Sequence, residues 1–502
     1  MTIKRALTCI IAAVFLPALS TSCPPLFAQS ISLLKQVYVR TPSTLTVHKD
    51  SCRISGFARK GEKALVVRPA LCFMFDKNTG GEYLVRLKNG TSGYIPSEYC
   101  CDTQEEALAR YESGTYDPLH SAAKDRFHGG DPLGCDYFPR EKPVFKDNVM
   151  PRACYCMYLP ASASILGNID EYIALALRTK INCFIMDIKE DGLPGFKADA
   201  MRRYAPSAYR RAQDNASLYE TAVRKCHENG IWCVARIVTF KDYHFTKDHP
   251  ECALWDKRSG AMLYHNKSNW PSAYCRLVWE YNVSLAREAV RRFGFNEVNF
   301  DYVRFPDRMN SIEESIEMRN TYGESKVQAI QRFVQYACDQ LHKDGVYVSI
   351  DVFGESANAG YTTAYGQYWP AISNVADVIC GMPYPDHFSN GYYGIDKPWN
   401  HPYEILHAWG TRAQNRQAET PTPAVVRTWV QAYHVMKHVD KNGIDYNAPN
   451  IEKEVRGLYD AGCTGGYATW LSSGSLNRYR EISPAFTIDY YSDWLASGRT
   501  GN

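Results

Sequence analysis

The stretch that decides the fold is residues 280–302, EYNVSLAREAVRRFGFNEVNFDY, in which a helical pattern is followed by a short apolar strand. Its first part, Glu280–Arg292, has the apolar spacing of an amphipathic helix, and Glu297–Tyr302 is a brief apolar run that ends in polar residues. The same alternation recurs from Ala153 onward. Such a pattern is typical of βα units arranged in a parallel sheet.

Eight apolar runs of this kind predict eight strands, at Ala153–Leu159, Cys183–Asp187, Trp232–Val238, Glu297–Tyr302, Tyr347–Val352, Val378–Met382, Val425–Gln431 and Gly466–Leu471. Helical patterns lie between them, at Asp170–Thr179, Leu218–Glu228, Glu280–Arg292, Lys326–Leu341 and Ile451–Asp460. Eight strands close a barrel, so the chain is predicted to be an α/β protein with a (β/α)8 TIM barrel over residues 152–490. An open doubly wound sheet is the alternative, but no glycine-rich phosphate loop follows any strand.

Residues 32–101 contain short alternating runs separated by turn signals, which predicts a small all-β barrel before the larger domain. The ending of this segment, Gly90 to Tyr99, resembles the last strands of a bacterial Src-homology-3-like domain, a module attached to wall-directed enzymes. The alternative is a β-barrel that only packs against its neighbour. Residues 102–151, rich in Asp, Pro, Gly and His, read as a linker.

Residues 1–28 have the pattern of a signal peptide, with Lys4 and Arg5 before an apolar stretch and a cleavage site ending at Ala28. Lipid anchoring at Cys23 is disfavoured, because Ser20 stands where a lipobox carries an aliphatic residue. The mature protein is therefore predicted to be secreted or periplasmic, and no later stretch is apolar enough to span a bilayer. The net charge of +3 gives no argument for nucleic acid as a partner.

Fifteen of the 17 cysteines lie after the predicted leader, an odd number, so at least one is expected to be unpaired. Those inside the apolar strands are expected to behave as small core residues; they are Cys154, Cys156, Cys183, Cys233 and Cys380. Cys100, Cys101 and Cys135 are the better candidates for disulfides.

Three carboxylates end predicted strands: Asp187, Asp301 and Asp351. The active site of a (β/α)8 barrel forms at these strand ends. Any one of the three could instead cap the following helix. Glycoside hydrolysis needs two carboxyl groups roughly 5–9.5 Å apart, and neighbouring strands about 4.8 Å apart allow that separation.

The polar and aromatic residues of the same strand ends and loops are predicted to bind substrate. Arg236 and Arg304 near the acids would lower the pKa of whichever carboxylate pairs with them, although Asp301 and Arg304 could simply form a salt bridge that closes the loop. Aromatic faces suit sugar rings. The predicted binding residues are Arg236, Arg304, Tyr302, Tyr384, Asp386, His387, Gln431 and Trp470.

A metal-dependent hydrolase is a weaker interpretation. It would need clustered ligands, whereas four loop histidines, His244, His249, His265 and His387, lack the usual ligand spacing. No metal or other cofactor is therefore predicted.

Several of these motifs together resemble a family long catalogued as a domain of unknown function and regarded as glycoside hydrolase-like, related to the α-amylase barrels. They are residues 182–189, 235–242, 249–251, 294–306, 351–354 and 382–385, with Phe300 to Pro306 the most specific. By analogy with amylase-like barrels, the resemblance implies that Asp301 is the nucleophile and Asp351 the proton donor. Glu355 is a weaker choice for the donor, and Asp187 would be an auxiliary carboxylate.

The leading hypothesis is a glycosidase that acts on an extracellular or cell-wall polysaccharide. The second is a carbohydrate-binding or wall-associated scaffolding protein whose barrel no longer catalyses. Whether Asp301 and a second carboxyl group face one pocket within catalytic distance distinguishes the two.

Overall fold

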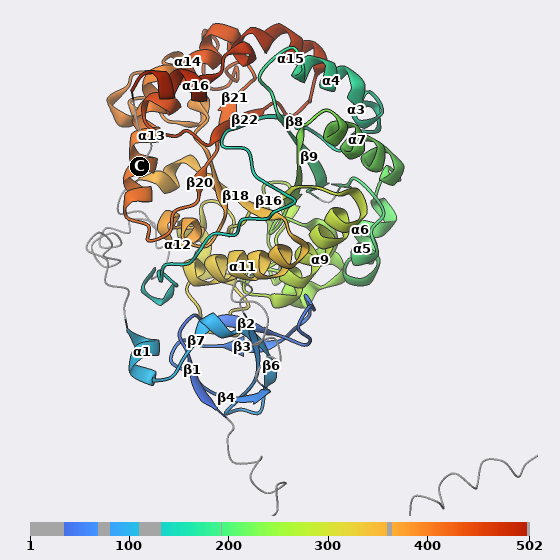
Figure 1. Ribbon diagram of the computed structural model, residues 1–502, viewed down its shortest axis with the longest axis vertical. Coiled ribbons are helices and arrows are strands. Elements are labelled where there is room, and N and C mark those ends of the chain that lie inside the picture. The colour runs from blue at the N-terminus through green and yellow to red at the C-terminus, as the bar shows by residue number, and fades with distance from the viewer. Residues whose placement is uncertain (1–34, 69–80, 110–131, 192, 359–363, 499–502) are drawn as a thin grey trace, which may run out of the picture.

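The computed structural model describes residues 35–68, 81–109, 132–191, 193–358 and 364–498 (Figure 1). The predicted signal peptide and Cys23 lie outside these ranges. Within the described ranges, no helix combines the length and the apolar character needed to cross a membrane.

The larger part of the chain forms a closed barrel of eight parallel strands. The seventh strand is split at Arg427: its first half pairs with β19 and its second half with β22, and β22 pairs with β8, so the barrel closes. The (β/α)8 prediction is confirmed, and the open-sheet alternative is wrong. The strands are β8 (Cys154–Leu159), β9 (Cys183–Glu190), β11 (Trp232–Val238), β16 (Glu297–Asp301), β18 (Tyr347–Phe353), β19 (Val378–Met382), β20 (Val425–Val426), β21 (Thr428–Gln431) and β22 (Gly466–Trp470).

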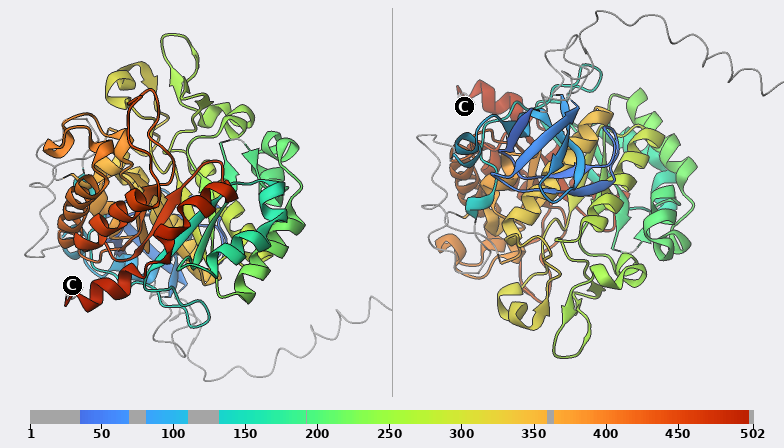
Figure 2. Two further views of the ribbon diagram at one scale, coloured as in Figure 1. Left: turned by 90° about the horizontal axis from the view of Figure 1, so that it is seen from above. Right: turned by 90° about the horizontal axis from the view of Figure 1, so that it is seen from below.

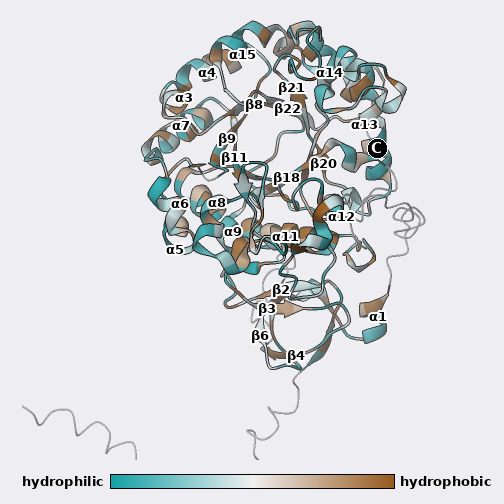
Figure 3. Cartoon of the chain, turned by 180° about the vertical axis from the view of Figure 1, so that it is seen from behind, coloured by the Kyte–Doolittle hydropathy of each residue, from teal (hydrophilic) through white to brown (hydrophobic). Residues whose placement is uncertain are grey.

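Helices surround the barrel, and each of them contains both hydrophobic and hydrophilic residues (Figure 3). The sequence pattern missed α13, because its buried positions include Gly410, Arg416 and Gln417, which interrupt the apolar stripe. The principal helices are α4 (Ile169–Ala176), α5 (Asp199–Tyr204), α6 (Pro206–Arg211), α7 (Ala216–Glu228), α9 (Arg276–Phe293), α11 (Lys326–Leu341), α13 (Pro402–Ala418), α14 (Ala448–Asp460), α15 (Leu476–Ile482) and α16 (Tyr490–Ala496).

The N-terminal part is a small, wholly antiparallel seven-stranded sheet, as the sequence predicted, with strand order β3-β2-β6-β5-β4-β1-β7. Its apolar core includes Val37, Leu45, Val85 and Ile95. The resemblance to a bacterial Src-homology-3-like domain stays a prediction. The strands are β1 (Gln36–Val39), β2 (Ser43–Thr46), β3 (Ile54–Ala58), β4 (Lys63–Arg68), β5 (Glu82–Leu87), β6 (Ser92–Pro96) and β7 (Cys100–Cys101).

The small domain packs beside α9 and α11 (Figure 1). The ring of Phe57 lies 5.0 Å from the Arg276 guanidinium and 4.7 Å from that of Arg332. Both arginines bind Glu324 at 2.5 Å, so two cations share one buried carboxylate beneath an aromatic ring. The contact is specific enough to fix how the two domains sit together.

Part of the predicted linker, residues 132–150, crosses the end of the barrel at which the strands begin (Figure 1). The Lys142 ammonium donates to the carbonyls of Ser373, Asn374 and Ala376, and the Asn148 amide donates to those of Asn296 and Gly345. This segment therefore covers the N-terminal end of the barrel and leaves the opposite end for the loops.

A buried ion pair lies among the apolar side chains of the barrel. Arg427 donates to Glu297 at 2.7 Å, and both side chains are at most 1% exposed. Trp232 donates its indole N–H to the other oxygen of Glu297 at 3.2 Å. A charge pair of this kind contributes little net stability, but it is costly to break, because the remaining charge stays buried without a partner.

We therefore expect Arg427→Met to lower the free energy of unfolding by about 3–5 kcal/mol. The double variant Arg427→Met/Glu297→Leu removes both charges and should recover most of that loss. Urea unfolding followed by circular dichroism measures both. Equal loss in the single and double variants would show that packing, rather than the unpaired carboxylate, dominates.

Candidate active site

The C-terminal ends of the barrel strands enclose a pocket of about 190 Å³. Both carboxylates proposed as the reacting pair, Asp301 and Asp351, lie in its wall. The lining residues are Glu190, Arg236, Asp301, Tyr302, Arg304, Asp351, Phe353, Met382, Tyr384, His387, Trp429 and Trp470.

Arg236 on β11 is the centre of the site. Its Nη1 donates to Asp187 Oδ1 at 2.6 Å and to Glu190 Oε2 at 2.8 Å, and its Nη2 donates to Asp301 Oδ2. Its Nε lies 4.0 Å from Asp351 Oδ2. One fully buried guanidinium thus hydrogen-bonds to three carboxylates from β9 and β16, the strands on either side of β11.

Glu190 was not predicted as a site residue, because a β-bulge in β9 determines which way it points. In β9, Asp187 pairs with Arg236 but the next pair is Lys189 with Ile237, so Ile188 is an extra residue. Strict alternation would turn Lys189 toward the pocket. The bulge turns Glu190 there instead, and Lys189 pairs with Asp242 at 2.7 Å. Burial opposes ionisation of Glu190, but Arg236 outweighs it and holds the Glu190 pKa below its ordinary value.

Asp301, the last residue of β16, uses both carboxylate oxygens as acceptors. Oδ2 receives the Arg236 guanidinium, and Oδ1 receives the backbone N–H of Tyr302 at 2.6 Å. Tyr302 has φ of 54°, a left-handed conformation that costs energy for a residue with a bulky side chain. The turn thereby brings the next peptide N–H back onto the carboxylate, so both oxygens of Asp301 accept hydrogen bonds.

Asp351 on β18 has the opposite environment. Its Oδ1 accepts from Asn299 at 2.9 Å and from the Trp429 indole at 2.8 Å, whereas its buried Oδ2 has no partner. Burial, followed by the charge of Asp301, raises the pKa of Asp351 to about 8. At neutral pH this carboxyl group therefore carries a proton.

Asp187 lies beneath the pocket rather than in its lining. It accepts from the Tyr158 hydroxyl and from Arg236. Burial raises the pKa of Asp187 to about 6 even though Arg236 opposes the shift. Its carboxylate contacts Arg236, and its expected role as an auxiliary carboxylate stays a prediction.

A family model described as "Putative glycosyl hydrolase domain" matches residues 156–479, most of the barrel. The chain belongs to this glycosyl hydrolase family. A search of curated proteins finds no match.

Solved structures similar to this glycosyl hydrolase barrel include a hypothetical protein from Ruminiclostridium thermocellum, with 30% identity over 39% of this chain and 97% of that one, at a TM-score of 0.33. The PgaB (BpsB) glycoside hydrolase domain from Bordetella bronchiseptica is 10% identical over 69% and 100% of the two chains, with a TM-score of 0.47. The Bacillus cereus spore cortex-lytic enzyme SleL is 11% identical over 68% and 77%, with a TM-score of 0.40.

Three other predicted site residues of this chain do not line the pocket. Gln431 accepts the backbone N–H of Asp386 at 3.3 Å, and the Tyr433 hydroxyl donates to Asp386 at 2.8 Å, so both residues join neighbouring loops. Glu355 lies in the 3-10 turn Gly354–Ala357, where burial raises its pKa.

The salt bridge between Asp301 and Arg304, considered as an alternative role for these residues, does not form. Arg236 is the ion-pair partner of Asp301, and the carboxylate nearest Arg304 is Asp307, at 3.7 Å. The alternative in which Arg304 closes the loop by binding Asp301 is wrong, because the loop turns away at Tyr302.

Aromatic rings supply the apolar part of the pocket wall. The rings of Trp429 and Trp470 lie 5.6 Å apart and nearly perpendicular, and Tyr384 lies 6.5 Å from Trp470. Trp429 was not predicted, because nothing local in its sequence shows that it reaches Asp351 across the barrel. The histidines considered as metal ligands are dispersed. His387 lines the pocket, His249 Nδ1 lies 3.0 Å from Glu251 Oε1, and His265 contacts Asp307.

Two loops of the glycosyl hydrolase barrel project together on the side of the mouth (Figure 2). The loop after β11 contributes β12 (Trp255–Asp256) and β13 (Ala261–Met262), and the loop after β16 contributes β17 (Ile316–Glu317). These strands form one three-stranded sheet in the order β13-β12-β17. The pocket wall on this side is therefore tied together across two βα units.

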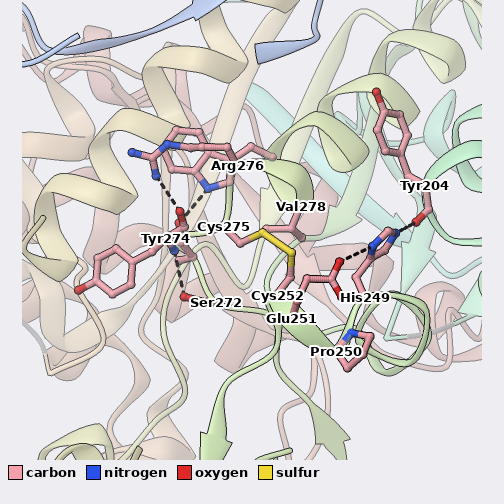
Figure 4. The surroundings of a disulfide bond; sticks show 12 residues. Tyr204, His249, Pro250, Glu251, Cys252, Ser272, Tyr274, Cys275, Arg276 and Val278 are labelled. Atoms are coloured by element: carbon pink, nitrogen blue, oxygen red, sulfur yellow. Dashed lines mark hydrogen bonds and ion pairs between the residues drawn. A yellow bond between two sulfur atoms is a disulfide. The ribbon is translucent and has the colours of Figure 1, made fainter. Parts of the chain in front are cut away.

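A disulfide between Cys252 and Cys275 joins the first of these loops to the start of α9 (Figure 4). The prediction that Cys100 and Cys101 form disulfides is wrong, and Cys135 forms no disulfide with another described cysteine. Cys252 and Cys275 come together only because the loop returns to the helix, with Ser272 donating its backbone N–H to the carbonyl of Cys252 at 2.7 Å.

Removing this disulfide should loosen the loop. A bridge between residues 23 apart constrains the unfolded chain, so we expect Cys252→Ser to cost about 3 kcal/mol of stability. Thermal unfolding of Cys252→Ser and Cys275→Ser, with Cys226→Ser as a control for a buried free thiol, measures this. Equal melting temperatures for the oxidised parent and both bridge variants would contradict it.

Proposed function

We propose that this protein is a glycosidase that hydrolyses a polysaccharide, with Asp301 and Asp351 as the reacting carboxyl pair. The observation that carries the proposal is their contrast within one pocket. Asp301 has both oxygens occupied by donors, and Asp351 has a free buried oxygen and a pKa of about 8. Glycoside hydrolysis requires one ionised and one protonated carboxyl group on either side of the scissile bond.

In this mechanism, Asp351 transfers its proton to the glycosidic oxygen as the bond from that oxygen to the anomeric carbon breaks. The Asp301 carboxylate either bonds to the anomeric carbon, after which water releases the sugar, or takes a proton from the attacking water. The aromatic rings of Trp429, Trp470 and Tyr384 would hold the apolar sugar faces during the reaction.

We further propose that the protein acts outside the cytoplasm on an extracellular or cell-wall glycan. The signal-peptide pattern of residues 1–28 supports export. The small β-domain would then hold the barrel near its polymer. The competing function, glycan binding without hydrolysis, is supported by the aromatic wall alone and gives no role to the raised pKa of Asp351.

The test is release of reducing ends from a panel of bacterial and plant polysaccharides by the protein from Gln29 onward. Hydrolysis of at least one polymer, absent in Asp301→Asn, is the expected result. Retention of a polymer on an affinity gel without any cleavage by the unmodified protein would favour the binding function.

A further inference from the structure

Arg304 stands out because it is a buried cation with almost no hydrogen-bond partner. Its residue is 5% exposed and lines the pocket. The single hydrogen bond that its guanidinium makes to another described residue runs from Nη1 to the carbonyl of Phe305, at 3.1 Å. Buried charges normally have a partner, so an arginine that uses one of its five N–H groups here is unusual.

The nearest carboxylate does not fill this need. Asp307 Oδ1 lies 3.7 Å away, and the same oxygen already contacts His265 at 3.1 Å and Asn266. Burial lowers the pKa of Arg304, and the surrounding groups, including Asp301 and Glu355, offset that only in part. Arg236, in the same pocket, hydrogen-bonds to three carboxylates.

The guanidinium is nevertheless held firmly. Three rings surround its central carbon: Phe353 at 4.4 Å, Tyr302 at 4.8 Å and Trp270 at 5.1 Å. Stacking of this kind fixes the plane of an arginine without using its donors. The Arg304 nitrogens that make no hydrogen bond are not fully shielded from solvent. Because Arg304 lines the pocket, we take these unused N–H groups to be accessible from it.

A second cation lies on the same side. The Lys241 ammonium is 5.2 Å from the centre of the Tyr302 ring that Arg304 also contacts, and it pairs with Asp191 at 2.9 Å. A second cation, paired with Asp191, therefore lies beside the Tyr302 ring that Arg304 also contacts.

We propose that Arg304 binds the carboxylate of a uronic acid residue, so that the glycan accepted by this pocket is an acidic polysaccharide. The planar fork of a guanidinium matches the two oxygens of a carboxylate and gives a bidentate, charge-assisted contact. This inference rests on the proposed function only in taking the ligand to be a sugar, and binding and hydrolysis are measured separately.

The experiment is calorimetric titration of the intact Asp301→Asn protein, which should bind without turnover. The probes are oligogalacturonate and oligoglucuronate, each beside its methyl ester, together with a sulfated galactan oligomer. We expect at least one uronate to bind about tenfold or more tightly than its ester, because hydrogen bonds to a charged group are strong. Arg304→Gln should abolish that preference and Arg304→Lys should retain part of it, while Arg258→Gln, in the exposed β12–β13 turn, should leave it unchanged.

Any of three binding results would overturn the inference: no uronate binding more tightly than its ester, a preference that persists in Arg304→Gln, or a preference for the sulfated oligomer over both uronates. The comparison of acid with ester uses Arg304 intact, so it decides the matter even if Arg304→Gln does not fold. Cleavage of a neutral polymer would reject the inference and leave the glycosidase standing. Tighter uronate binding without cleavage of any polymer would support the inference and count against the glycosidase function.

Discussion

Asp301→Asn should lower kcat on the best polysaccharide on the order of 10⁴-fold or more, because it removes the only proposed nucleophile or base. The substitution keeps the side-chain volume, and its amide oxygen can still accept the N–H of Tyr302. Arg236 keeps Asp187 and Glu190 as partners, so the pocket should stay assembled. Release of reducing ends under saturating substrate measures the effect.

The matched control is Asp170→Asn, which removes a carboxylate from the outer face of the barrel, where it pairs with Lys225. Its activity should equal that of the unmodified protein. Binding of the substrate by Asp301→Asn, with a melting temperature close to that of the parent, separates lost chemistry from lost folding. An Asp301→Asn protein that retains more than a tenth of the activity would remove Asp301 from the mechanism.

Asp351→Asn should lower kcat about 10²–10⁴-fold on polysaccharides, the usual contribution of a general acid. The amide oxygen can keep the hydrogen bonds from Asn299 and Trp429, so the change removes the proton and little else. Aryl glycosides with an acidic phenol as leaving group should be affected far less, since they depart without protonation. A loss that is equal on both kinds of substrate would show that Asp351 is not the proton donor.

The pH profile follows from the same group. Burial and the Asp301 charge raise the Asp351 pKa to about 8, so the protonated acid is present below that pH and is lost above it. Activity on polysaccharides should therefore fall as the pH rises through about 8. The alkaline limb should disappear in Asp351→Asn, whose residual rate should be independent of pH in that range. An alkaline limb that persists in the variant would assign it to another group.

The local sequence predicted the barrel well. The strands β11 and β19 have the expected bounds, and the other strands differ from the predicted ones by a few residues at their ends. The prediction of the strands succeeds because each βα unit contains, within its own local sequence, an apolar run followed by an amphipathic segment. The acidic strand ends were predictable for the same reason: Asp187, Asp301 and Asp351 follow apolar runs that must lie in the sheet.

The sequence by itself thus determined the eight-stranded barrel, the small antiparallel domain and the three acids at the mouth. Only the tertiary structure decided which side chains those acids meet. Trp429 reaches Asp351 from 78 positions away, the β9 bulge turns Glu190 inward, and Cys252 forms a disulfide with Cys275. It also left Arg304 without a carboxylate partner at hydrogen-bonding distance. Secondary structure follows local periodicity, but protonation and pairing depend on burial and on contacts between distant parts of the chain, which no local pattern encodes.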